Sequence, residues 1–188
     1  DFLNKVKNQK NFNIFKYRNF YNGGGVAIGD INNDGLADIY LTGNMVANKL
    51  YLNKGNLTFE DISISAGIEG NKPWSTGVVM VDINQDGLLD IYVSNAGNLK
   101  GNNHDNDLYI NNGDLTFTEK AAEFNLAKTG FSTHASFFDY DKDGDLDAYI
   151  LNNSNIPVSS LGYAEQRDKR AQDWANVPEI FRGVGDML

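Results

Sequence analysis

The stretch Asp30-Ile31-Asn32-Asn33-Asp34-Gly35-Leu36-Ala37-Asp38 decides the fold, because close copies of it occur twice more along the chain. The second copy spans residues 82–90 (DINQDGLLD) and the third spans residues 139–147 (DYDKDGDLD). Each copy carries an oxygen-bearing side chain at its first, third, fifth and ninth positions. Its sixth residue is glycine, where the chain has to turn sharply. Oxygen atoms on alternate residues of a tight loop form the ligand set of a hard cation.

Calcium fits this donor set, because it takes about six to eight oxygen ligands at roughly 2.3–2.6 Å in a flexible shell. The chain has no cysteine and neither histidine lies in one of these loops, which disfavours zinc and copper. The sequence therefore predicts three Ca²⁺ sites, one per loop, with the seventh residue of each loop contributing its backbone carbonyl. The predicted ligands are Asp30, Asn32, Asp34, Leu36 and Asp38; Asp82, Asn84, Asp86, Leu88 and Asp90; and Asp139, Asp141, Asp143, Asp145 and Asp147.

Two other interpretations of the loop compete with this one. An EF-hand needs a bidentate Glu at position twelve and a helix on either side, but position twelve is Leu41, Val93 or Ile150 and the flanking residues are typical of strands. A plain hairpin would also use Asp, Asn and Gly in its turn. Turn chemistry alone does not require an acid at the ninth position, so three copies with that acid favour a metal loop between two strands.

Composition limits the classes of function. The net charge is −9, and three bound Ca²⁺ ions would reduce it to about −3, so ion binding explains most of the acidity. Nucleic acid is not an expected partner, because its binding needs a Lys/Arg face. No apolar run approaches the ~20 residues of a membrane span. The absence of cysteine excludes a disulfide scaffold.

A second module repeats together with the loop. Residues 48–61 (NKLYLNKGNLTFED) match residues 106–119 (NDLYINNGDLTFTE), and both indicate a strand, an Asn/Gly turn and another strand. The loop starts are 52 and 57 residues apart, within the range of solenoid and propeller repeats. Each repeat thus contains four short antiparallel strands, the size of one propeller blade.

These two modules resemble the FG-GAP/VCBS repeat, the integrin-α-like β-propeller, in the version found in bacterial secreted and cell-surface proteins. The resemblance covers about residues 23–155. It implies an all-β propeller of about seven four-stranded blades, of which about three are present, with one Ca²⁺ near the rim of each blade. It also implies a non-catalytic binding or adhesion scaffold.

The expected organisation is an N-terminal packing segment (1–22) and three blades (23–70, 71–128 and 129–188). The aromatic rings of the first segment are expected to pack against the first repeat. The third blade contains an insertion, residues 156–185, with a short helix, and residues 186–188 begin another hairpin module and stop. The chain is therefore expected to be a fragment of a longer protein.

The predicted function is a calcium-binding module at the bacterial cell surface or outside the cell, with a protein or carbohydrate partner and no enzymatic activity. Other outer-membrane proteins are further candidate partners. Two alternatives stay open, a structural subunit of an outer-membrane surface assembly and a calcium-dependent hydrolase or lyase, although no base for catalysis stands out. His104 and His134 are interpreted as structural or exposed residues, and Trp74 as a packing residue rather than a platform for a sugar ring.

Overall fold

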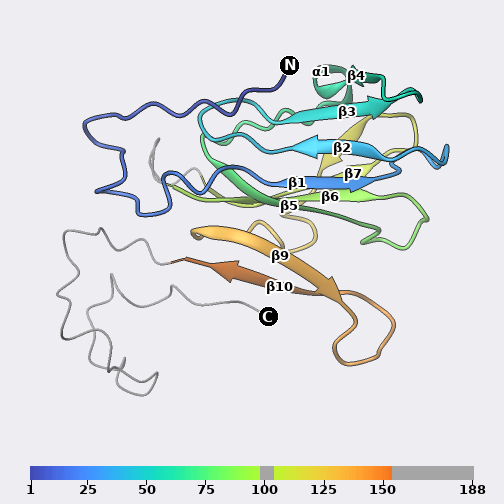
Figure 1. Ribbon diagram of the computed structural model, residues 1–188. Coiled ribbons are helices and arrows are strands. Elements are labelled where there is room, and N and C mark those ends of the chain that lie inside the picture. Colours follow the sequence, from blue (N-terminus) through green and yellow to red (C-terminus); the bar gives the residue numbers. More distant parts are fainter. Residues whose placement is uncertain (98–103, 154–188) are drawn as a thin grey trace.

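The computed structural model describes residues 1–97 and 104–153 of this chain (Figure 1). The insertion expected at 156–185 and the end of the third repeat lie outside the described residues. Within these ranges the elements are strands and one short helix. The strands are β1 (Val26–Gly29), β2 (Asp38–Leu41), β3 (Lys49–Asn53), β4 (Phe59–Asp61), β5 (Ser75–Val81), β6 (Asp90–Asn95), β7 (Asp107–Asn111), β8 (Phe117–Glu119), β9 (Ser132–Phe138) and β10 (Asp147–Asn152).

The strands form separate antiparallel sheets, one for each repeat. The first sheet has the order β1-β2-β3-β4, the second has the order β5-β6-β7-β8, and β9 pairs with β10. Consecutive strands are neighbours throughout, as short antiparallel connections require. The prediction of an all-β fold with four-stranded antiparallel sheets is confirmed. The three nine-residue loops at 30–38, 82–90 and 139–147 are called ion loops below, after their predicted ligand. Strands flank each of them, so the structure also excludes an EF-hand.

The three ion loops occupy equivalent places in the three sheets. Each connects the first strand of its sheet to the second, and in each the ninth residue pairs with the residue that precedes the loop. These register pairs are Gly29 with Asp38, Val81 with Asp90, and Phe138 with Asp147. Figure 1 shows that all three loops lie on the same side of the stacked sheets, at the right of the view.

The sheets stack through their first strands, since β1 lies against β5 and β5 lies against β9. One apolar cluster, which includes Ile31, Leu50 and Val78, fills the space between the first and second sheets. A second cluster, which includes Tyr92 and Ala135, lies between the second sheet and the β9–β10 pair. Burial of these side chains is the main force that holds the sheets together.

Glycine is required where the first strands begin. A Cβ atom on Gly25 would lie 2.6 Å from the carbonyl oxygen of Thr76, and one on Gly77 would lie 2.3 Å from that of Thr133. No side chain fits at such a distance from backbone, so these two residues allow neighbouring strands to approach closely.

The N-terminal segment packs its rings inside the structure, but not mainly against the first repeat as the sequence predicts. Phe12, Tyr17 and Phe20 surround Trp74, which begins the second repeat and is 1% exposed. Their ring centroids lie 5.0–5.7 Å from that of Trp74. The interpretation of Trp74 as a packing residue is confirmed, because a side chain so buried cannot stack on a sugar.

The helix α1 (Ser63–Ala66) follows β4 and was not expected from the sequence. It is a single turn that ends at Gly67, whose φ of 75° gives the left-handed conformation common after helices. In the described part of the chain, no helix has the length and apolar character needed to cross a membrane.

Candidate metal centres

The first and fifth residues of each loop shape its backbone. In the first loop, Asp30 accepts hydrogen bonds from the backbone N–H groups of Asp34 (3.1 Å) and Gly35 (2.7 Å), and Asp34 accepts one from Leu36 (2.8 Å). The second loop repeats all three bonds, at 2.9–3.0 Å, with Asp82, Asp86, Gly87 and Leu88 in the same roles. The loop therefore curls around the carboxylates of its own first and fifth residues.

Two residues of each loop adopt left-handed backbone conformations. The sixth residue is the expected glycine, with φ of 85° at Gly35, 88° at Gly87 and 97° at Gly144. The fourth residue is also left-handed, with φ between 57° and 65°, although it is Asn33, Gln85 or Lys142. This feature was missed in the sequence, because Gln and Lys have no preference for that conformation.

The ninth residue of the first two loops is a buried structural acceptor. Asp38 accepts backbone hydrogen bonds from Ile31 (3.0 Å) and from Asn53 on β3 (2.8 Å). Asp90 does the same with Ile83 (3.0 Å) and with Asn111 on β7 (2.8 Å). Both side chains are fully buried, and this burial raises the pKa of each carboxyl. Each oxygen still has a lone pair for an ion.

Asn53 and Asn111 are site residues that sequence reasoning did not identify. Besides binding the ninth-position carboxylate, the side-chain amide of Asn53 donates to the carbonyl of Ala37 (2.9 Å), and that of Asn111 donates to the carbonyl of Leu89 (3.1 Å). Both bonds attach the loop to the third strand of its sheet. The signal was present in the sequence, since both residues end the repeated strand KLYLN or DLYIN.

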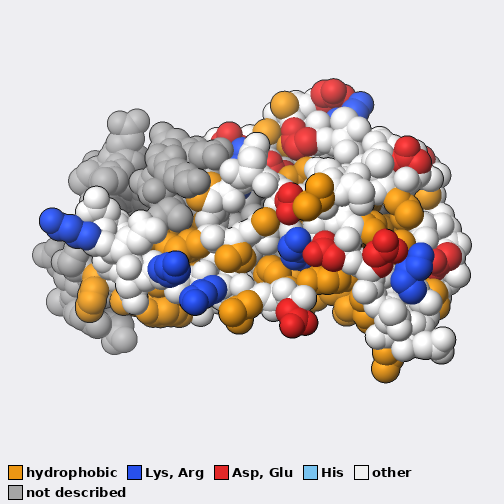
Figure 2. All heavy atoms as spheres, turned by 90° about the horizontal axis from the view of Figure 1, so that it is seen from above, with side chains coloured by type: hydrophobic (Ala, Val, Ile, Leu, Met, Phe, Trp, Pro, Cys, Tyr) orange, Lys and Arg blue, Asp and Glu red, His pale blue; other side chains and the backbone are white. Residues whose placement is uncertain are grey.

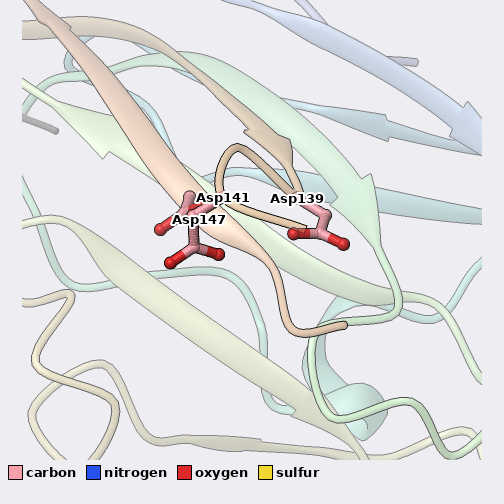
Figure 3. A group of neighbouring side chains, drawn as sticks. All are labelled: Asp139, Asp141 and Asp147. Atoms are coloured by element: carbon pink, nitrogen blue, oxygen red, sulfur yellow. The ribbon is translucent and has the colours of Figure 1, made fainter. Parts of the chain in front are cut away.

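The third loop brings its carboxylates together without an asparagine among them. Asp139, Asp141 and Asp147 each offer an oxygen atom, and these atoms lie within 4.8 Å of one another (Figure 3). Asp139 and Asp141 are exposed and Asp147 is half-buried. Nearby, hydrogen bonding and charge from Asp143 raise the pKa of the Asp145 carboxyl.

In the first two loops the third residue is Asn32 or Asn84. Each side-chain amide donates to the carboxylate at the fifth position, at 3.0 Å to Asp34 and 2.8 Å to Asp86. The amide oxygen of each is left facing the loop backbone, where it accepts a bond from the N–H of that same aspartate. The predicted ligands at positions one, three, five and nine thus lie within one hydrogen-bonded loop in both sheets.

The donor chemistry of the loops fits a calcium ion. Apart from the amide nitrogens of Asn32 and Asn84, which bind the fifth-position carboxylates, the polar atoms of the predicted ligands are oxygen atoms, and these suit a hard cation. Among the described residues, none of the ion pairs between Lys or Arg and an acid involves a loop carboxylate. The loop carboxylates are therefore not held in close ion pairs within the described part of the chain, although Lys142 is the fourth residue of the third loop. The seventh-position carbonyls of Leu36, Leu88 and Asp145 stay predicted ligands.

The two histidines do not take part in these loops. His104 is buried, with its ring centroid 5.2 Å from that of Phe131, and His134 is exposed on β9.

Comparison with known proteins agrees with the repeat pattern. A family model described as an FG-GAP-like repeat matches residues 30–93, which contain the first two loops, and residues 96–150, which contain the third. The chain belongs to the FG-GAP-like repeat family. This assignment supports the resemblance derived from the loops and hairpin modules, whereas a VCBS type and a bacterial source have no support from it.

Relatives of this FG-GAP-like chain include cartilage acidic protein 1 from several vertebrates. The Xenopus tropicalis protein is 34% identical over 137 residues, which are 71% of this chain and 20% of that protein. The Mus musculus protein is 30% identical over 135 residues, 69% of this chain and 20% of that protein. The Homo sapiens protein is 37% identical over 76 residues, 40% of this chain and 12% of that protein. The chain thus spans about a fifth or less of the length of these relatives.

Proposed function

We propose that this chain is a calcium-stabilised part of a β-propeller that acts outside the cell as a non-catalytic binding scaffold. The observation that carries the proposal is the threefold repetition of one loop geometry. Three nine-residue loops lie on one side of the stacked sheets: the first two hold carboxylates and an asparagine oxygen, the third holds carboxylates alone, and none of the ion pairs among the described residues involves a loop carboxylate. Turn formation does not need this charge, whereas calcium binding does.

Calcium would act on stability rather than on chemistry. A bound ion neutralises the carboxylates that the loop holds together and fixes the turn between the first two strands of a sheet. Because the ion binds the folded loop far better than the unfolded chain, its binding free energy adds to the free energy of unfolding. Extracellular modules bind calcium with dissociation constants as weak as ~10⁻⁴–10⁻³ M, which extracellular calcium saturates but cytosolic calcium does not. This supports a location outside the cell; a bacterial outer-membrane surface stays a prediction.

The outer faces of the stack support a larger propeller. Val78 on β5 faces the first sheet and is 5% exposed, whereas Val26, the equivalent residue of β1, is 58% exposed. At the other end, Ile31 is 2% exposed between two sheets, and its equivalent Tyr140 is 69% exposed. The same positions that bury apolar side chains between sheets are thus open at both ends of the described stack. A further sheet of the same kind at each end would cover them, as in a propeller of about seven blades.

The partner is proposed to be a protein or a carbohydrate. On the face in Figure 2, Lys and Arg side chains are scattered among acidic, apolar and neutral side chains, and at most two of them lie next to each other. A polyanion would require them to be gathered into one patch. A partner that bound the loop carboxylates through cationic groups would compete with calcium for these carboxylates. No described group combines a nucleophile, a base and a cleft, so the proposal assigns no reaction to this chain.

The experiment is thermal unfolding in millimolar calcium, in EDTA, and in EDTA with excess magnesium. The proposal predicts that calcium raises the midpoint by on the order of 10 °C, because three sites at about tenfold saturation contribute about 1.4 kcal/mol each and 1 kcal/mol is worth about 2–4 °C in a domain of this size. Magnesium is expected to restore little, since it is reluctant to lose its water ligands. A midpoint that chelation leaves unchanged would contradict the proposal.

A further inference from the structure

Two equivalent hydrogen bonds join ion loops that belong to different sheets. The side-chain amide of Asn33 in the first loop donates to the carbonyl of Gly87 in the second, at 3.0 Å. The side-chain amide of Gln85 in the second loop donates to the carbonyl of Gly144 in the third, at 2.6 Å. In both cases the fourth residue of one loop binds the sixth residue of the next. Repetition at two interfaces indicates a property of the loop and not an accidental contact.

The accepting carbonyl lies between two predicted ligands of its own loop. The N–H of Gly144 donates to the first-position carboxylate of Asp139 (3.2 Å), and the next residue, Asp145, supplies the predicted carbonyl ligand. Gly87 has the same place between Asp82, which accepts its N–H at 2.9 Å, and Leu88. A bond from the neighbouring sheet therefore fixes the peptide group that leads to the carbonyl ligand.

The donating residue also lies between two ligands. Gln85 is flanked by Asn84 and Asp86, and its backbone is left-handed, with φ of 59°. An ion that closes the second loop would hold this strained backbone in place. The Gln85 side chain is then already directed at the third loop, so less order has to be gained when that loop binds its ion.

We infer that Asn33 and Gln85 are positioning residues that couple calcium binding in neighbouring loops. An ion in one loop raises the affinity of the next, and by thermodynamic linkage the effect is equal in both directions. This inference rests on the proposed calcium binding and extends it from three separate sites to a row of coupled ones.

A further bond joins the first two loops in the opposite direction. The side-chain amide of Asn111 donates to the carbonyl of Ile31 in the first loop (2.8 Å), while its backbone N–H binds Asp90 of the second. The first loop and the second sheet are thus linked by two side-chain amides, which is expected to strengthen the coupling between the first two loops.

The experiment uses terbium in place of calcium, because a tyrosine close to bound Tb³⁺ transfers excitation to it. Tyr140 is the second residue of the third loop, so the luminescence that Tyr140→Phe removes reports that loop alone. The test compares the parent chain with Gln85→Ala, which removes the bond to Gly144 but none of the predicted ligands. Asn33→Ala is the matched control, since it removes the equivalent bond between the first and second loops, from Asn33 to Gly87.

We expect Gln85→Ala to raise the terbium dissociation constant of the third loop about two- to fivefold, which corresponds to one exposed hydrogen bond. The number of calcium ions bound per chain, measured by isothermal titration calorimetry, stays that of the parent. Asn33→Ala changes the Tyr140 signal less than Gln85→Ala does. In metal-free buffer, Gln85→Ala is expected to speed hydrogen exchange at Gly144 and Asp145, which tests the contact without any ion.

Two results would overturn the inference, and they are distinguishable. If the parent shows Tyr140-sensitised terbium binding and Gln85→Ala binds with the same affinity, the coupling is wrong while the calcium loops stand. If the parent binds neither terbium nor calcium, the proposed function fails, and the coupling fails with it.

Discussion

The first two ion loops and the third follow the same nine-residue plan, but they differ in charge and in the backbone bonds that the described residues give to the ninth carboxylate. Asp38 and Asp90 are fully buried, and each accepts one backbone hydrogen bond from its own loop and one from the third strand of its sheet. Asp147, at the same position of the third loop, is half-buried, and within the described residues its backbone bond comes from Tyr140 alone. The first two loops are therefore attached to their sheets by the protein itself.

The loops also differ in charge. Asn32 and Asn84 each donate to the aspartate at the fifth position, whereas the third loop has Asp141 in their place. An additional carboxylate raises repulsion in the empty loop and strengthens attraction to a cation, because ligand charge tunes calcium affinity. The difference teaches that one sequence pattern serves two needs. With one carboxylate more, the third loop is expected to depend more on its ion, while the ninth carboxylate of the first two loops also binds the third strand of its sheet.

The largest expected effect comes from the buried ninth residue. We expect Asp90→Ala to reduce the free energy of unfolding by about 2 to 4 kcal/mol in EDTA, because two backbone donors lose a charged acceptor inside the protein. Asp147→Ala, its counterpart in the third loop, should cost about 1 kcal/mol or less. Urea unfolding of both variants measures the difference. Equal losses would remove the distinction between the loops.

Asp107 is a buried carboxylate outside the ion loops, and it can be compared with Asp38 and Asp90. Asp107 on β7 accepts one bond from the Asn95 side chain (2.9 Å) and lies 4.0 Å from the Lys72 ammonium, and burial raises its pKa to about 6. A carboxyl with a raised folded-state pKa destabilises the protein increasingly as the pH rises from its unfolded value near 4 through 6. Asp107→Asn should thus stabilise the chain by roughly 1–3 kcal/mol at pH 7 and much less at pH 4.

The control is to repeat this comparison with and without calcium. The pH-dependent gain in stability of Asp107→Asn should be the same in both, since Asp107 lies outside the ion loops. Urea unfolding of the parent and the variant at both pH values would show this. A gain in stability that is independent of pH, or one that appears only in EDTA, would contradict the account.

Removal of calcium should disturb the third loop more than the first two. Hydrogen exchange at Gly144 and Asp145 is expected to become about tenfold faster in EDTA, equivalent to about 1.4 kcal/mol of lost local stability. The exchange of Gly35 and Gly87 should change less, because their loops keep the bonds from Asp38 and Asp90 to the third strand. The same acceleration in all three loops would show that these bonds give no advantage.

The smallest effect is expected from Asp141→Asn, which gives the third loop the pattern of the first two. In EDTA the variant should unfold at a slightly higher urea concentration, since a like charge is removed and an amide donor to Asp143 is added. Its calcium affinity at this loop should fall roughly three- to tenfold. Terbium luminescence from Tyr140 measures the second effect. A variant that binds the ion more tightly would be inconsistent with the role of charge.

The parts of the fold that were predictable from the sequence are those set by local chemistry. Short runs rich in β-branched and aromatic residues before and after each loop determine the strands, and the Asp-Gly pattern determines the turn between them. The contacts of Asn111 and Gln85 with other sheets could not be predicted, because they depend on how the sheets stack. The packing of the N-terminal rings around Trp74 could not be predicted for the same reason. The neighbours of a side chain on other sheets depend on how the sheets are arranged, and the periodicity of the sequence does not predict that arrangement.

The most direct test of the central claim is the number of calcium ions bound per chain, measured by isothermal titration calorimetry on the calcium-free protein. The account predicts three ions, and two in either Asp34→Ala or Asp86→Ala, because each variant removes a ligand from one loop. A parent chain that binds no calcium at millimolar concentration, or a variant that binds as many ions as the parent, would contradict it.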